Sequence, residues 1–367
     1  MKPDTQRRII FLDLMRALAV IMMVQGHTID TFLSDQFRTH DSVVYNIWFT
    51  IRGFTAPIFM FTSGVAFTYL FRLNKSPFIE NPRVKKGIYR FITLVLIGYL
   101  LRYPTPRMVD FSLVDHYQWL TFFNVDALHL IGFGILFILV LGYFGEKYKI
   151  TDTKIFTIGA AFFFISFFFT EKINWANFLP IPFAGYFYSG TGSYFPLFPW
   201  SGYVISGAIL GSYLANNPGS FESKNFSLQL FKIGVALLII CVGINILQYF
   251  LYGQKEFWTD NTALIFYRLG FIILLNSLMS FISIKLKNIP DIIKLVGKNT
   301  LLIYVLHVII LYGSAWIPGF GMFWPKTLGI PLSILAAVLL IAVMFIIVSI
   351  FEKIKTYKRR KILAAEI

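Results

Sequence analysis

The first apolar segment of the chain carries four ionisable side chains on one face. On an α-helix their positions fall within a stripe about 100° wide, because each residue turns the helix by about 100°. The four residues are Asp13, Arg16, His27 and Asp30. An imidazole in such a stripe can take up a proton near neutral pH, as general acid–base catalysis requires. His27 is therefore the first candidate catalytic residue.

The same stripe also has structural explanations. Asp13 and Arg16 lie three residues apart, so they can form an ion pair within the helix. His27 can equally serve as a hydrogen-bonded residue between packed helices. Arg16 and His27 are nearly eclipsed and about 16 Å apart along the axis, so they belong to different depths of any site that uses both.

Other apolar segments carry isolated polar side chains that we interpret as candidate binding residues. An ionisable group at the centre of a membrane span costs at least about 2.5–3.5 kcal/mol, so its presence indicates a function by default. The candidates are Arg52, Asp126, His129, Trp200, Arg268 and His307. Asp126 and His129 lie three residues apart and share a helical face. The five histidines form no paired motif, so no metal site is expected.

The elements that position these residues must lie in a membrane. The 367 residues are 57% hydrophobic and 14% charged, and the mean hydropathy is +0.68. Soluble domains are about 45–50% apolar and about 25% charged, so the chain has too much apolar surface to hide from water. The same composition excludes intrinsic disorder. The sequence predicts an all-α, polytopic integral membrane protein.

About ten segments are apolar and long enough to approach the roughly 20 residues that a spanning helix needs. They are residues 9–32, 46–71, 88–102, 127–144, 155–170, 194–214, 230–252, 262–284, 297–315 and 329–351. The first is expected to be a retained span rather than a cleaved signal peptide, because no small-residue cleavage site follows it. The chain is expected to form one transmembrane domain over residues 1–367.

The basic residues provide an independent test of this count. If ten spans alternate, 24 of the 33 Lys and Arg residues fall on the side of both termini, 6 fall on the other side, and 3 lie in spans or at their ends. This asymmetry follows the positive-inside rule, so both termini are predicted to be cytoplasmic. The net charge of +15 therefore reflects topology, and no nucleic-acid partner is expected.

Two predicted outer loops, residues 103–126 and 171–199, are rich in Trp, Tyr and Pro. Such loops are either interfacial belts or platforms for sugar rings, and the residues leave both open. Cys241 is the lone cysteine, so no intramolecular disulfide is possible.

Several segments, in order, resemble the membrane acyltransferase superfamily. Its first-span signature is similar to the run LDLMRALAVIMMVQGH at residues 12–27, and the spacing of Arg16 and His27 is shared with the acyltransferase-3 O-acetylases. Three later runs resemble the branch of heparan-alpha-glucosaminide N-acetyltransferase and its bacterial relatives: GFTAPIFMFTSGVAF (53–67), DALHLIGFGILF (126–137) and FPLFPWSGYVISGAILG (195–211). The run VGKNTLLIYVLHVIIL (296–311) resembles a penultimate span that is common to the superfamily.

This resemblance implies an acyltransferase that moves an acetyl group from cytoplasmic acetyl-CoA to an extracytoplasmic sugar or amino sugar. It implies a histidine near the outer end of the first span as base or acyl carrier. His27 matches the O-acetylase histidine, whereas the heparan-type enzyme has asparagine there and a histidine slightly later. His40 is therefore the reserve candidate.

The remaining roles are hypotheses that fit this chemistry. Asp30 lies one turn from His27 and could orient it, as carboxylates support catalytic histidines. Arg16 could meet the phosphate end of CoA, and Arg52 or His307 could polarise the acyl carbonyl. Transfer to oxygen or nitrogen, and direct transfer or an acetyl-histidine intermediate, both stay open.

The partners implied are acetyl-CoA, a glycan or amino-sugar acceptor and the lipid bilayer, with a homo-oligomer also compatible. The expected location is the bacterial cytoplasmic (inner) membrane. A secondary transporter for sugars or related small molecules is the second hypothesis, since polar residues within spans also mark substrate paths. No inverted repeat that would favour a transporter is visible. A scaffold subunit would have little reason to carry Arg16, His27 and His307.

Overall fold

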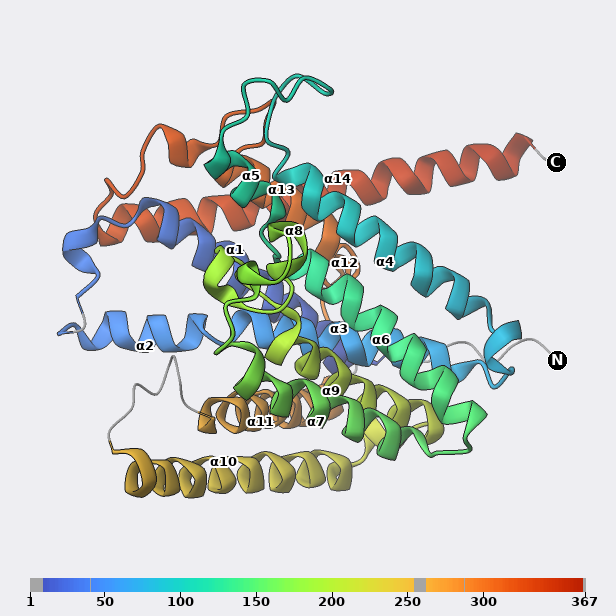
Figure 1. Cartoon of the computed structure of the whole chain (residues 1–367). Coiled ribbons are helices and arrows are strands. Elements are labelled where there is room, and N and C mark those ends of the chain that lie inside the picture. Colours follow the sequence, from blue (N-terminus) through green and yellow to red (C-terminus); the bar gives the residue numbers. More distant parts are fainter. Residues whose placement is uncertain (1–8, 40, 254–261, 287, 366–367) are drawn as a thin grey trace. The chain divides into compact units, whose positions relative to one another are not determined.

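The computed structural model describes residues 9–39, 41–253, 262–286 and 288–365 (Figure 1). These residues form helices and connecting loops, and their only β-type pairings are two isolated bridges. The α-helices are α1 (Ile10–Phe32), α2 (Val43–Arg52), α3 (Thr55–Leu73), α4 (Pro82–Leu101), α5 (His116–Phe123), α6 (Ala127–Lys147), α7 (Asp152–Thr170), α8 (Ile181–Ala184), α9 (Leu197–Asn216), α10 (Lys224–Tyr252), α11 (Ala263–Lys285), α12 (Asp291–Lys298), α13 (Thr300–Tyr312) and α14 (Ile330–Ala365). The predicted all-α class is confirmed.

Seven helices or helix pairs in the described residues are long and apolar enough to cross a membrane. An eighth span results if α12 and α13, which meet at an angle of 76°, count as one. The ten expected spans also include α4 and α9, which are not among these eight. The first turns of α4 carry Arg83, Lys85 and Lys86, and α9 is diluted by glycine and serine. The multi-span architecture is confirmed at this coarser level.

The chain divides into two compact units. The terminal unit consists of residues 1–55 and 286–367, and the central unit of residues 56–285. Each is described by itself below.

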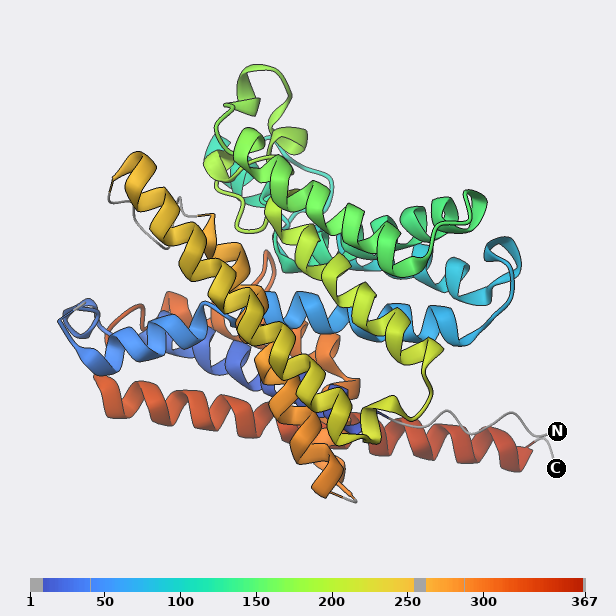
Figure 2. The same cartoon turned by 90° about the horizontal axis from the view of Figure 1, so that it is seen from below.

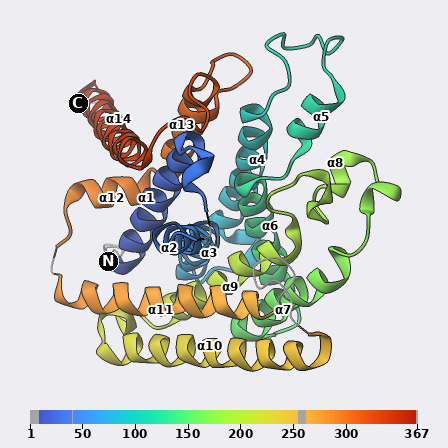
Figure 3. The ribbon, with the colours of Figure 1, turned by 90° about the vertical axis from the view of Figure 1, so that its left-hand side faces the viewer.

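In the terminal unit, α1 packs against α12, α13 and α14 (Figure 3). Its core-facing side chains, such as Phe11, Met15 and Val20, are almost completely buried. The far end of α1 is tied to the segment before α14 by two hydrogen bonds: the Leu328 N–H donates to the Phe32 carbonyl at 2.8 Å, and the Lys326 N–H to the Thr31 carbonyl at 2.9 Å. Segments from opposite ends of the sequence therefore form one helix cluster.

In the central unit, α6 packs against α4, α7 and α9, and α10 runs beside α11 (Figure 2). Helices α3 and α9 approach so closely that only glycine fits between them. A Cβ atom on Gly64 would overlap the Val204 carbonyl oxygen, and one on Gly207 would overlap the Phe61 carbonyl oxygen. Close backbone approach at small residues is the usual way in which membrane helices associate.

We expect Gly207→Ala to destabilise the central unit, because the added methyl group meets a backbone carbonyl that cannot move without shifting α3. The expected loss is about 1–3 kcal/mol, as for overpacking in other cores. Gly243→Ala is the matched control, since nothing lies within 4 Å of its added Cβ. Thermal unfolding in detergent measures both variants, and equal midpoints would contradict the glycine contact.

Candidate functional site

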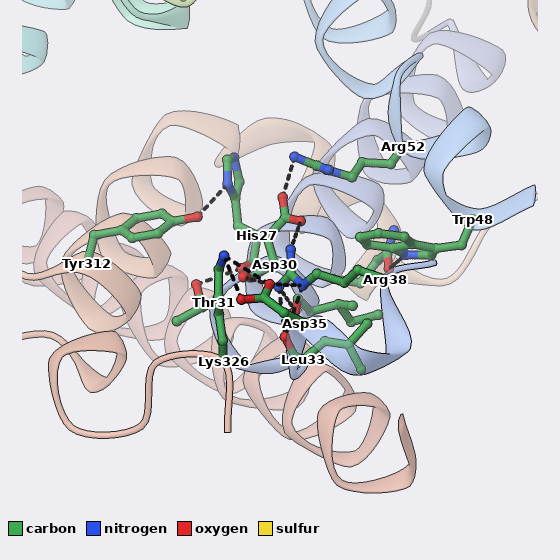
Figure 4. A network of polar contacts seen from close by, with 12 residues as sticks. His27, Asp30, Thr31, Leu33, Asp35, Arg38, Trp48, Arg52, Tyr312 and Lys326 are labelled. Atoms are coloured by element: carbon green, nitrogen blue, oxygen red, sulfur yellow. Dashed lines mark hydrogen bonds and ion pairs between the residues drawn. The ribbon is translucent and has the colours of Figure 1, made fainter. Parts of the chain in front are cut away.

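His27 lies near the end of α1, and its ring is held by a tyrosine from the opposite end of the chain. Its Nδ1 atom lies 2.9 Å from the Tyr312 hydroxyl, and the Tyr312 ring meets the imidazole edge-on (Figure 4). Among the hydrogen bonds of the described residues, only Nδ1 of this ring is used, so Nε2 is available to a ligand. No sequence pattern points to Tyr312, because 285 positions separate it from His27.

A second imidazole lies beside the first. The rings of His27 and His307 are 5.4 Å apart. His307 is fully buried in α13, and its Nδ1 lies 2.8 Å from the Ile303 carbonyl oxygen. A carbonyl only accepts hydrogen bonds, so Nδ1 must carry the proton and Nε2 of the neutral ring must hold the lone pair. Within the described structure that buried Nε2 has no partner, so it can accept a proton from a ligand.

Asp30, one turn beyond His27, is neutralised by arginines. It forms an ion pair with Arg52 from the last turn of α2, and Arg38 Nη1 lies 3.5 Å from its other oxygen (Figure 4). Arg38 also donates to the backbone carbonyls of Asp30 and Leu33, at 2.6 and 2.9 Å. The ion-pair partners of Asp30 are thus arginines. The His27 imidazole is hydrogen-bonded to the Tyr312 phenol rather than to Asp30.

Helix α2 positions Arg52 over the His27 helix. The Arg52 guanidinium lies over the Trp48 ring, 5.5 Å from its centroid, and the Trp48 indole N–H donates to Gln25 Oε1 at 3.0 Å. The Arg52 stem packs on α1 at Gly26, where an added Cβ would lie 3.5 Å from Arg52 Cγ, an ordinary van der Waals distance. Arg52 and Asp30, both predicted from sequence, are therefore brought into one cluster with His27.

One predicted residue of α1 lies away from this cluster. Arg16 is eleven residues before His27 on α1, about 16 Å away along the axis. His40 lies outside the described residues.

In the central unit, Asp126 and His129 form the N-terminal cap of α6. The Asp126 carboxylate accepts from the Leu128 N–H at 2.9 Å and lies 2.9 Å from His129 Nδ1, while Arg102 Nε is 3.6 Å from its other oxygen. His129 is completely buried against α4, where a Cβ on Gly98 would come within 2.5 Å of its ring. These contacts place both residues in a helix cap. The His129 Nε2 atom is buried without a hydrogen-bond partner in the described structure.

Trp200 and Arg268 form a separate cluster in the same unit. The Arg268 guanidinium of α11 lies over the Trp200 ring of α9, 5.0 Å from its centroid. Arg268 Nε and the Ser201 hydroxyl are buried without a hydrogen-bond partner in the described structure, and the Tyr203 hydroxyl interacts with the Arg268 side chain. Unused polar atoms around a cation inside a membrane helix favour a ligand site.

Comparison with known families decides the identity. The family described as heparan-alpha-glucosaminide N-acetyltransferase, catalytic, matches residues 8–255, which is more than half of the chain. The chain belongs to this family. A comparison with curated proteins gave no match.

Membership in the heparan-alpha-glucosaminide N-acetyltransferase family confirms the resemblance found in the sequence and makes the chain a multi-pass membrane protein of an acetyltransferase family. The match includes His27, Arg52 and Trp200. It ends before Arg268, His307 and Tyr312, so part of the cluster around His27 comes from outside the matched region.

We expect Asp126→Ala to destabilise the central unit more than a simple cap loss would. The cap is worth about 1 kcal/mol, and the buried donors left unpaired add roughly 1–3 kcal/mol. Asp115→Ala is the control, because Asp115 caps α5 in the same way but is exposed. Thermal unfolding compares the two, and an effect no larger at Asp126 would show that its buried network adds nothing.

Proposed function

We propose that this protein transfers an acetyl group from acetyl-CoA on the cytoplasmic side to a sugar or amino sugar on the other side of the membrane. The observation that carries the proposal is the His27 imidazole, held by Tyr312 beside a second imidazole on a membrane helix. The acetyltransferase family supplies the reaction class. The proposed transfer uses side-chain groups alone and assigns no role to a metal ion.

His27 acts through Nε2. When Nδ1 carries the proton and donates to the Tyr312 oxygen, Nε2 holds the lone pair. As a base, Nε2 takes the proton from the acceptor hydroxyl or amine while that atom attacks the thioester carbon and the CoA thiolate leaves. As an acyl carrier, Nε2 attacks the thioester carbon itself and displaces the CoA thiolate. The acceptor then attacks the acetyl carbon, the bond to Nε2 breaks, and the restored Nε2 lone pair takes the acceptor's proton. Both routes need the same free ring nitrogen.

Arg52 and His307 have the two remaining roles, stabilisation of the acyl oxygen and binding of the acceptor. The Arg52 guanidinium is a fixed cation near His27, suited to stabilise negative charge that develops on the acyl oxygen. Asp30 holds it in place through their ion pair, so this carboxylate acts on the site through Arg52. His307 presents a lone pair and no proton at Nε2, so it is suited to accept a hydrogen bond from the acceptor rather than to polarise the carbonyl.

The donor enters from the cytoplasmic side in this proposal. Arg16, deeper on α1, is a candidate for the phosphate end of CoA, and Arg268 with Trp200 offers a cation and an aromatic face for the same kind of ligand. The ligand-binding role expected of Asp126 and His129 stays a prediction, since the contacts described above serve the helix cap. The catalytic role of His40 also stays a prediction.

We further propose ten spans with both termini cytoplasmic, within one transmembrane domain in the bacterial cytoplasmic membrane. Helices α4 and α9, each of 20 residues, are about 30 Å long and would bring the eight candidate spans to ten. The 24 to 6 distribution of basic residues supports this arrangement. A homo-oligomer stays a prediction.

Replacing His27 by Ala tests the central claim. In membranes supplied with acetyl-CoA and methyl α-D-glucosaminide, we expect acetyl transfer and CoA release to fall about 10²- to 10⁴-fold, the usual contribution of a positioned acid–base group. His116→Ala is the control, because His116 is exposed at the start of α5. Full activity of His27→Ala would eliminate the proposed mechanism, and wild-type protein that releases no CoA would point to a transporter.

Tyr312→Phe tests whether the phenol holds the imidazole. Loss of this one hydrogen bond should lower kcat about fivefold, since a single hydrogen bond contributes roughly 1 kcal/mol, while the KM for acetyl-CoA stays the same. Tyr117→Phe, an exposed tyrosine, is the control. Unchanged kcat in Tyr312→Phe would show that the contact with Nδ1 has no part in the reaction.

A further inference from the structure

The loop between α13 and α14, residues 313–329, carries a group of exposed aromatic side chains. Trp316, Phe320, Phe323 and Trp324 are 42%, 51%, 61% and 52% exposed. The Phe320 and Trp324 rings lie 6.1 Å apart and are tilted by 32°, and the Phe323 and Trp324 rings lie 6.0 Å apart. We call residues 313–329, with these side chains, the aromatic loop. So many large rings on one short segment indicate a binding surface.

The aromatic loop begins at the His27 site and is anchored to the helix that carries His27. It follows directly after Tyr312, whose hydroxyl contacts the imidazole. A Cβ on Gly321 would lie 2.7 Å from Thr31 Cγ2 and 2.9 Å from the Leu311 carbonyl oxygen, so the middle of the loop rests on α1 one turn beyond His27. Lys326 adds an ion pair with Asp35 at 3.0 Å (Figure 4).

The loop is also preorganised by a tight turn. Gly313, with a φ of 82°, pairs with Pro318 in an isolated bridge, and the Ser314 N–H donates to the Ile317 carbonyl at 2.8 Å. Trp316 lies inside this turn, where its backbone N–H donates to the Ser314 hydroxyl oxygen at 3.3 Å. A side chain on a fixed turn loses little freedom when a ligand binds.

The surroundings of the loop favour a carbohydrate over the bilayer as its occupant. Irregular backbone exposed to lipid does not occur in the hydrocarbon region, so a loop of this kind lies in water or among headgroups. The neighbouring charges of Asp30, Arg38, Asp35 and Lys326 would be costly to immerse in lipid. A sugar ring needs an aromatic face for its C–H groups and polar partners for its hydroxyls, and this surface offers both side by side.

We propose that the aromatic loop is the platform on which the acceptor sugar stacks while it is held over His27. This inference rests on the proposed function. It places acceptor recognition outside residues 8–255, the part of the chain that matches the acetyltransferase family. His27 and Arg52 lie within the matched region, whereas the platform lies in residues 313–329.

Kinetics of Trp324→Ala and Trp316→Ala test the platform. With methyl α-D-glucosaminide as acceptor, we expect the acceptor KM to rise about five- to tenfold, as the loss of one aromatic contact predicts, with the KM for acetyl-CoA unchanged. Phe250→Ala is the control, because Phe250 is an exposed aromatic on α10. Trp variants that behave like Phe250→Ala would overturn the platform while leaving the acetyltransferase proposal intact.

A binding measurement separates the two proposals. Tryptophan fluorescence of the His27→Ala protein is titrated with methyl α-D-glucosaminide, and we expect a saturable change that disappears when Trp324→Ala is added. If the sugar binds in this way but the wild-type protein transfers no acetyl group, the proposed function is wrong and the sugar platform stands. If the Trp variants lose only association with lipid vesicles and keep sugar binding, the loop is a membrane anchor and the platform is wrong.

Discussion

The high free energy of an unpaired ion in an apolar surrounding governs the polar contacts of this protein. Asp30 lies near the end of a membrane helix and is matched by Arg52 and Arg38 from the segments that follow α1. Asp126 meets the same requirement in the central unit, where Arg102 and the N-terminal N–H groups of α6 surround it. Charged groups in both units therefore act as fixed points around which helices and loops are arranged.

The same constraint separates structural groups from functional ones. The contacts of Asp126 explain its presence as a helix cap, since its oxygens are all engaged by the protein. His129 Nε2, His307 Nε2 and Arg268 Nε are different, because the described structure leaves these atoms buried and unpaired. A ligand can complete such atoms, and the His307 ring also lies beside His27, which is why His307 enters the functional proposal.

The His27 site also depends on joining the two ends of the sequence. Helix α1 supplies the imidazole, whereas α13 supplies the second imidazole and Tyr312. The hydrogen bonds between the end of α1 and residues 326–328 hold this arrangement and present the aromatic loop beside it. The family match covers α1 and ends before α13, so the site combines residues from inside and outside the matched range.

Apolar composition and helical spacing are local properties, so the sequence alone predicts the membrane environment and the helical class. The ordered sequence motifs indicate the family, which the comparison shows, and they select His27 as the candidate histidine. The sequence also found Arg52 and His307 through the cost of placing polar groups in a span. The tertiary structure decided that Asp30 pairs with arginines and that Tyr312 holds the imidazole. Those contacts join residues up to 285 positions apart, and no periodicity along the chain specifies which distant side chain will fill a given position.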